Sequence, residues 1–108
     1  MTVQPHPQID IDRSAIAVFC QKWRVSELAL FGSILRDDFN ADSDVDILVT
    51  FNESAKWTLW DWQSMTEDLE QIFHRPVDLV SKKAIERSEN YIRRRHILEH
   101  QETIYAAG

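Results

Sequence analysis

The chain has 108 residues, a formal net charge of −6 and 44% hydrophobic residues. This length suits one compact domain with a modest hydrophobic core, and the acidic balance argues against a generic nucleic-acid binder, which would carry a basic face. The single cysteine, Cys20, excludes an internal disulfide, and its place in an apolar stripe favours a buried structural thiol. No apolar run approaches a membrane span and the N-terminus does not resemble a secretory signal, so a cytoplasmic location is the default.

The N-terminal third of the chain is predicted to contain one helix and one strand. Residues 1–8 are expected to form a flexible lead-in, and residues 9–108 a single domain. Asp10 or Asp12 can cap a helix whose apolar positions recur at i, i+3 and i+4. The buried stripe of this helix comprises Ala15, Ile16, Phe19, Cys20 and Trp23. Residues 25–31 are almost continuously apolar, which predicts a strand covered on both faces.

A second strand and a long helix are predicted in the middle of the chain. Residues 45–51 form an apolar run that is typical of a strand. A helix is expected over residues 59–73, and it is opened by a capping box in which Thr58 is followed three residues later by Asp61. The buried face of this helix comprises Trp62, Met65, Leu69, Ile72 and Phe73.

The C-terminal third is predicted to contain one more strand and one more helix. Residues 76–80 fit a third strand, and residues 81–86 a short helical turn. Ser88 can cap a last helix over residues 89–100. Residues 103–106 are expected to be a short apolar closure before a fraying end.

Two surface features have an open interpretation. Trp57 and Trp60 fall outside the buried helix face or at its start, so they either pack on the domain rim or form a partner-facing aromatic patch. The basic run over residues 93–96, together with Arg87, is expected to be a solvated helix face. The alternative is that this run contacts nucleotide phosphate or an acidic patch of a partner.

The most informative residues are two aspartates at the start of the second strand. Asp44 and Asp46 are two positions apart, so their side chains point to one face while the apolar residues between and after them point to the other. Two carboxylates on an apolar strand call for a counter-charge, and a hard divalent cation held by oxygens supplies it. Upstream, Gly32 and Ser33 can present backbone N–H groups and a hydroxyl to an anion. Together these features indicate a nucleoside triphosphate held with magnesium.

These residues carry a family resemblance. Gly32-Ser33, ten intervening residues and then Asp44-Val45-Asp46 resemble the signature of the DNA polymerase β-type nucleotidyltransferases. With Arg36 and the string Ser43 to Val49, the chain is similar to the minimal members, the MNT-domain proteins, over roughly residues 16–105. These are commonly the antitoxins of HEPN/MNT toxin–antitoxin pairs. The resemblance implies an α/β (α+β) fold with a small mixed β-sheet flanked by helices, as in the polymerase β palm.

The resemblance also implies residue roles. Asp44 and Asp46 are expected to bind Mg²⁺, and Asp78 is the candidate third carboxylate, which holds metal or serves as general base. The alternative for Asp78 is a solvated acid on an edge strand. The residues expected to bind nucleotide are Gly32, Ser33, Arg36 and Ser43. For Arg36, a structural ion pair with a neighbouring aspartate is an equally good interpretation.

The resemblance implies that the chain transfers AMP from ATP to a hydroxyl group. The expected acceptor is a tyrosine of a cognate HEPN ribonuclease toxin, and the modification neutralises that toxin. The expected partners are ATP and the toxin protein, in a hetero-oligomer, with no nucleic acid and no membrane. Two alternatives remain. The chain could be a catalytically silent antitoxin that acts by binding alone, although mutually repelling acids would then have no physical purpose. It could also modify a small molecule, but relatives of that kind carry a second domain for the acceptor.

Overall fold

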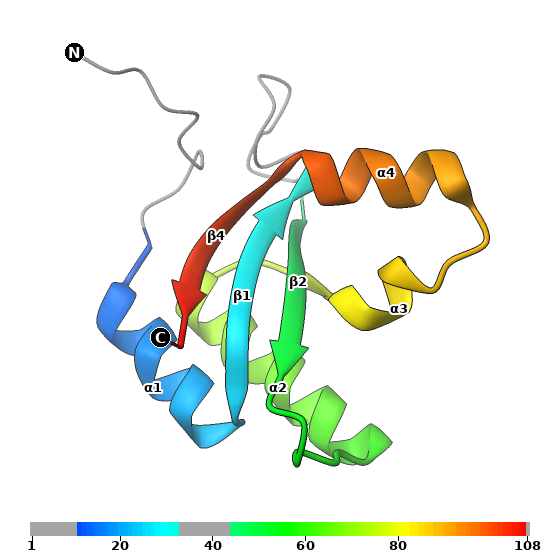
Figure 1. The fold of residues 1–108 in the computed structure, drawn as a ribbon. Coiled ribbons are helices and arrows are strands. Elements are labelled where there is room, and N and C mark those ends of the chain that lie inside the picture. Colours follow the sequence, from blue (N-terminus) through cyan, green and yellow to red (C-terminus); the bar gives the residue numbers. More distant parts are fainter. Residues whose placement is uncertain (1–10, 33–43, 108) are drawn as a thin grey trace.

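The chain folds into one mixed sheet with helices on both of its faces (Figure 1). The computed structural model describes residues 11–32 and 44–107. Its elements in chain order are α1 (Arg13–Lys22), β1 (Val25–Phe31), β2 (Val45–Phe51), α2 (Leu59–Phe73), β3 (Val77–Ser81), α3 (Lys82–Glu86), α4 (Tyr91–Glu99) and β4 (Gln101–Ala106). The four strands lie in the order β3-β2-β1-β4, where β1 is antiparallel to β2 and β4, and β2 is parallel to β3. The predicted fold class is confirmed.

The hydrophobic core lies on both sides of the sheet. On the face covered by α1 and α2, a large cluster includes Leu28 and Leu30 of β1 together with the buried residues of both helices. On the opposite face, a smaller cluster includes Ala29 and Phe31 of β1, and Ile97 of α4. Successive residues of β1 therefore enter different clusters, and this explains why that strand is apolar at nearly every position.

Helix α1 begins and packs as its sequence predicts. Asp12 is the capping residue, because its carboxylate accepts a hydrogen bond of 3.0 Å from the backbone N–H of Ala15. Ile16, Phe19 and Cys20 form the buried side of the helix. Cys20 is only 1% exposed, and burial raises the pKa of its thiol to about 12. Since a protonated thiol is a poor nucleophile, the prediction of a structural cysteine is confirmed.

Trp57 and Trp60, for which two interpretations were given above, differ in their exposure. Trp57 is half-buried and packs edge-on against Trp23 and Phe51, with ring centroids 5.3 and 6.3 Å apart. Trp60 is 81% exposed, and its neighbour Leu59 is 82% exposed. Rim packing therefore describes Trp57, whereas Trp60 stands out from the surface at the start of α2.

Helix α2 is opened by the capping box that the sequence predicts. The Thr58 hydroxyl accepts a hydrogen bond of 3.1 Å from the Asp61 N–H, and the Asp61 carboxylate accepts one of 2.9 Å from the Thr58 N–H. Each side chain therefore satisfies a backbone donor at a helix end that has no intrahelical partner.

Removal of this cap gives a testable prediction. We expect Thr58→Ala to lower the free energy of unfolding by about 1 kcal/mol, because the Asp61 N–H loses its acceptor. Urea denaturation measures the loss. A matched control is Thr66→Ala in the same helix, where the hydroxyl only donates to the Trp62 carbonyl one turn back and caps nothing. Equal losses for the two variants would contradict the capping role.

The C-terminal third contains the corrections to the predicted elements. The last helix begins at Tyr91 and is capped by Asn90, whose side chain accepts from the Arg93 N–H, so the prediction of Ser88 as the cap is wrong. The predicted apolar closure over residues 103–106 belongs to a strand that was not predicted, since Gln101–Ala106 forms β4 at the sheet edge. Its polar first half hides this strand, because an edge strand needs only one apolar face. Over the described residues, no helix has the length and apolarity needed to cross a membrane.

Candidate nucleotide-binding and catalytic site

The parallel pairing of β2 and β3 brings two of the predicted acids together. Asp46 stands directly opposite Asp78, and the flanking pair is Val45 with Val77. Both valines belong to the large cluster under α1 and α2. Since side chains alternate along a strand and opposite residues share a face, Asp46 and Asp78 both point to the face that carries α3 and α4. Two carboxylates that are distant in the sequence therefore become neighbours.

Asp44 lies immediately before β2. The Val45 N–H donates a hydrogen bond of 2.9 Å to the Pro76 carbonyl, so the pairing with the β3 segment extends to the end of β2 beside Asp44. Asp44 and Asp78 are exposed, and Asp46 is half-buried. Among residues 11–32 and 44–107, no three His, Cys, Asp or Glu side chains are gathered into a group that could hold a metal. The joint role of the three aspartates in metal binding is thus still a prediction.

Gly32 lies against the carboxylate of Asp46. Its φ of +76° belongs to the left-handed region, which glycine adopts without steric cost. A Cβ placed on Gly32 would overlap Oδ2 of Asp46 and would lie 3.2 Å from its Cγ. The neighbouring Phe31 stands directly opposite Asp46 in the antiparallel pairing of β1 and β2. The glycine of the first motif and the second aspartate of the other motif are therefore in contact, and the side chain at position 32 must be absent for this approach.

The remaining nucleotide-binding residues proposed from the sequence, Ser33, Arg36 and Ser43, lie outside the described residues. What the described part offers to a ligand is the Gly32 backbone and the carboxylate oxygens of Asp44, Asp46 and Asp78. Carboxylate oxygens are the ligands that Mg²⁺ prefers, and the missing Cβ at Gly32 leaves its backbone accessible. The donor set therefore fits magnesium.

A third polar residue, which the sequence analysis did not single out, stands in the same row across the sheet as Asp46 and Asp78. Gln101 of β4 stands opposite Phe31, which in turn stands opposite Asp46, so the row across the sheet is Gln101, Phe31, Asp46 and Asp78. The Gln101 amide donates a hydrogen bond of 3.0 Å to the Leu98 carbonyl, while its buried Oε1 has no hydrogen-bond partner among the described residues. Only recognition of β4 as a strand would have placed Gln101 here.

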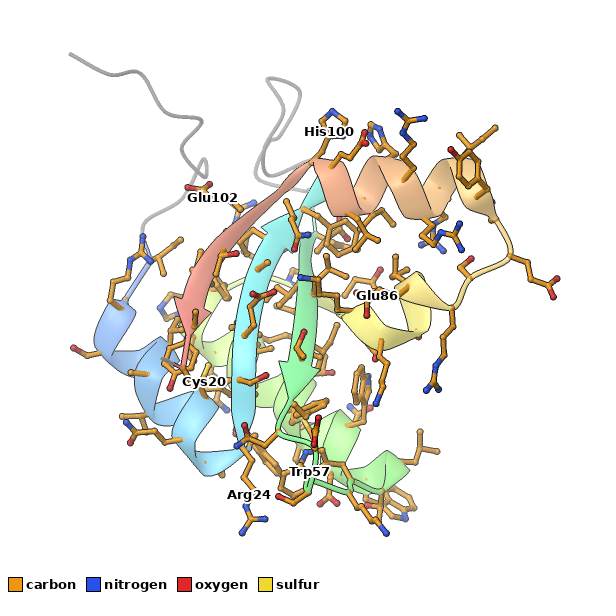
Figure 2. All side chains as sticks on the ribbon, in the orientation of Figure 1. Cys20, Arg24, Trp57, Glu86, His100 and Glu102 are labelled. Atoms are coloured by element: carbon orange, nitrogen blue, oxygen red, sulfur yellow. The ribbon has the colours of Figure 1, made fainter. Side chains whose placement is uncertain are left out.

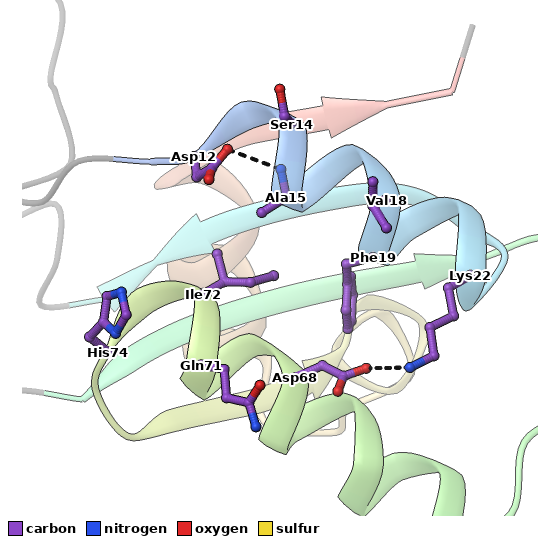
Figure 3. A pocket seen from close by; sticks show the side chains of 10 residues that line it. All are labelled: Asp12, Ser14, Ala15, Val18, Phe19, Lys22, Asp68, Gln71, Ile72 and His74. Carbon is purple, nitrogen blue, oxygen red and sulfur yellow. Dashed lines mark hydrogen bonds and ion pairs between the residues drawn. The ribbon is translucent and has the colours of Figure 1, made fainter.

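A groove between α1 and α2 is a second candidate cavity among the described residues (Figure 3). Its apolar part includes Val18, Phe19 and Ile72, and an ion pair of 3.0 Å between Lys22 and Asp68 lies at one side. Because α1 and α2 cover the sheet face opposite to the one that carries the aspartates, the sheet separates this groove from Asp46 and Asp78. A nucleotide bound in the groove could not reach them.

Comparison with known proteins points to one family. A family model described as a nucleotidyltransferase domain matches residues 13–102. An inferred protein adenylyltransferase of Methanocaldococcus jannaschii is 36% identical over 76 residues, which are 70% of this chain and 76% of that protein. The protein adenylyltransferase MntA of Thermococcus cleftensis is 38% identical over 65 residues, which are 60% of this chain and 64% of MntA.

Solved structures show the same fold at lower sequence identity. A toxin–antitoxin crystal structure with AMP-PNP superposes with a TM-score of 0.66 at 17% identity, and the match covers 90% of this chain and 75% of that one. A complex of the tri-AMPylated Shewanella oneidensis HEPN toxin with its MNT antitoxin gives a TM-score of 0.58 at 18% identity over 88% of this chain and 70% of that one. Sequence, fold and family model agree with the resemblance carried by the glycine–serine and aspartate motifs, and the chain belongs to the nucleotidyltransferase domain family.

Proposed function

We propose that the chain is a magnesium-dependent protein adenylyltransferase that transfers AMP from ATP to a hydroxyl of a protein acceptor. The acceptor is a tyrosine of a cognate HEPN-type toxin, which is neutralised by the modification. The observation that carries the proposal is the pairing of Asp46 with Asp78 on one sheet face, with the Gly32 backbone against Asp46. The names of the relatives and the AMPylated toxin in one structural neighbour support the choice of a protein acceptor. We propose a cytoplasmic location, where ATP is available.

The residues of this chain have distinct parts in the proposed reaction. Asp44, Asp46 and Asp78 would hold Mg²⁺, which when bound stabilises negative charge on the triphosphate and on the attacking and leaving oxygens. Gly32, which has no side chain, would let the phosphates approach its backbone closely. Asp78, the more exposed acid of the opposed pair, is the candidate base that accepts the acceptor's hydroxyl proton.

The proposed reaction balances without a further reactant. The acceptor oxygen forms a bond to the α-phosphorus of ATP while the bond from that phosphorus to the bridging oxygen breaks. Pyrophosphate leaves with the electron pair of the broken bond, and the hydroxyl proton passes to a carboxylate and then to solvent. In-line displacement of this kind depends mainly on positioning and charge stabilisation, and a Mg²⁺ ion held by the aspartates would supply the positive charge.

Label transfer tests this function. The purified chain is incubated with Mg²⁺, a lysate of its source organism and ATP labelled at the α-phosphate, and we expect label on a protein band. ATP labelled at the γ-phosphate is the control and is expected to leave that band unlabelled, because the γ-phosphate departs in pyrophosphate. Label on a small molecule would favour the small-molecule transferase, and no label at all would favour an antitoxin that acts by binding alone.

A further inference from the structure

The segment that forms α3, α4 and the turn between them is basic, although the protein is acidic. Residues 82–99 contain six of the 12 Lys and Arg residues but only three of the 18 Asp and Glu residues. The formal charge of this segment is therefore +3, and that of the remaining chain is −9. Opposite charges are thus divided between two parts of one small protein, and such a division guides the approach of a charged partner.

Helix α4 turns most of its side chains to solvent. Ile97 is its one buried residue, while Tyr91 is 57% exposed and Ile92 is 79% exposed. We define the α4 surface as Tyr91, Ile92, Arg93, Arg94 and Arg95, the first five residues of the helix. The surface combines guanidinium groups with an aromatic ring and an aliphatic side chain, and tyrosine and arginine are enriched at the energetic centres of protein interfaces.

Two of the three arginines of the α4 surface, Arg94 and Arg95, are held by contacts within the chain, and of the three only Arg95 pairs with an acid among the described residues. Arg94 donates to the Ser88 carbonyl at 3.1 Å and lies over the Tyr91 ring, 5.5 Å from its centroid. Arg95 pairs with Glu99 at 3.1 Å, and both of these side chains are more than half exposed. Within residues 11–32 and 44–107, neither Arg93 nor Arg94 forms an ion pair with a carboxylate. These guanidinium groups can therefore accept carboxylates from another molecule, which they bind with two parallel hydrogen bonds.

The α4 surface also lies on the catalytic side of the sheet. Ile97 packs in the same small cluster as Phe31 and Leu48, on the face to which Asp46 and Asp78 point. The helix leads directly into Gln101, which shares the row of Asp46. In Figure 1, the C-terminal end of α4 lies beside the end of the sheet where β1 ends and β2 begins, and the helix extends from there past β2. A macromolecule that brings a hydroxyl to the aspartates therefore approaches beside α4.

We propose that the α4 surface docks the protein acceptor through an acidic patch with an apolar centre, an inference that rests on the function proposed above. Carboxylates of the acceptor would pair with Arg93 and neighbouring arginines, and its apolar centre would cover Ile92 and Tyr91. The rest of the chain has a net charge of −9, which disfavours an acidic patch there on average, so the attraction to α4 also favours one orientation of the acceptor. A nucleic acid would meet the same repulsion over a much longer surface, and an exposed isoleucine offers it nothing, so a protein is favoured.

Charge reversal on α4 tests the docking surface. We expect Arg93→Glu with Arg95→Glu to slow the labelling of the acceptor band by about tenfold or more at low acceptor concentration. The matched control is Arg24→Glu with Lys56→Glu, which changes the net charge equally at exposed positions, and Figure 2 shows Arg24 at the opposite end of the molecule from α4. This control is expected to change the rate less than about twofold. Arg93→Lys with Arg95→Lys keeps the charge and is expected to retain most of the labelling.

The melting temperature of each variant and the identity of the labelled molecule complete the test. The rise in melting temperature caused by Mg²⁺ with ATP should be the same for all variants, because none alters the aspartates, and this shows that each variant is folded. Equal labelling by the wild type and the α4 reversal would overturn the docking surface and leave the proposed function intact. Label in an RNA fraction that ribonuclease removes, or label on the chain itself, would also overturn it. Absence of label with the wild type would remove the proposed function and the docking proposal together.

Discussion

Asp44→Asn combined with Asp46→Asn is expected to reduce AMP transfer on the order of a hundredfold or more, and to abolish the rise in melting temperature that Mg²⁺ with ATP produces. Asparagine has nearly the shape of aspartate but no charge, so the variant removes what a divalent cation requires while preserving the packing around β2. Asp44 is exposed and Asp46 is half-buried, which limits the direct effect on folding. The expected loss is therefore one of metal and nucleotide binding rather than of structure.

The measurement has two parts, label transfer from α-labelled ATP and thermal unfolding with and without Mg²⁺ and ATP. A matched control is Glu53→Gln with Glu86→Gln, which removes the same two charges at exposed positions outside the site. If the charge of the chain alone mattered, the control would lose nucleotide binding as well. If the aspartate variant keeps the full ligand-induced shift in melting temperature, the two aspartates do not hold the metal.

Local sequence signals predicted the elements that position the site. Apolar runs gave the bounds of β1 and β2, and the capping box marked the start of α2. Strand alternation also predicted which neighbours of Asp46 and Asp78 enter the core. These features depend on residues at most a few positions apart, so they can be inferred without knowledge of the tertiary structure.

Features that depend on pairing between distant segments could not be predicted in the same way. The contact between Gly32 and Asp46 requires the register of β1 on β2, and the placement of Asp46 beside Asp78 requires the register of β2 on β3. Strand β4 went unrecognised because Gln101 opens a polar run whose pairing with β1 is visible only in three dimensions. At the last helix, Ser88 and Asn90 are both good caps, and local sequence does not decide between them.

Gly32→Ala is expected to impair both folding and AMP transfer, because two separate requirements meet at this residue. Alanine at a φ of +76° carries a backbone cost of about 1–2 kcal/mol, and its methyl group would overlap the Asp46 carboxylate and displace it from the row that it shares with Asp78. Urea denaturation measures the first effect and label transfer measures the second.

Gly32→Asn separates the two requirements, because asparagine tolerates positive φ better than alanine but still brings a Cβ to the Asp46 carboxylate. We expect this variant to recover part of the stability lost in Gly32→Ala while transferring AMP as poorly. If Gly32→Asn instead transfers AMP at the wild-type rate, the close approach of Gly32 to Asp46 serves only the backbone turn. Retention of both stability and transfer by Gly32→Ala would show that neither requirement holds.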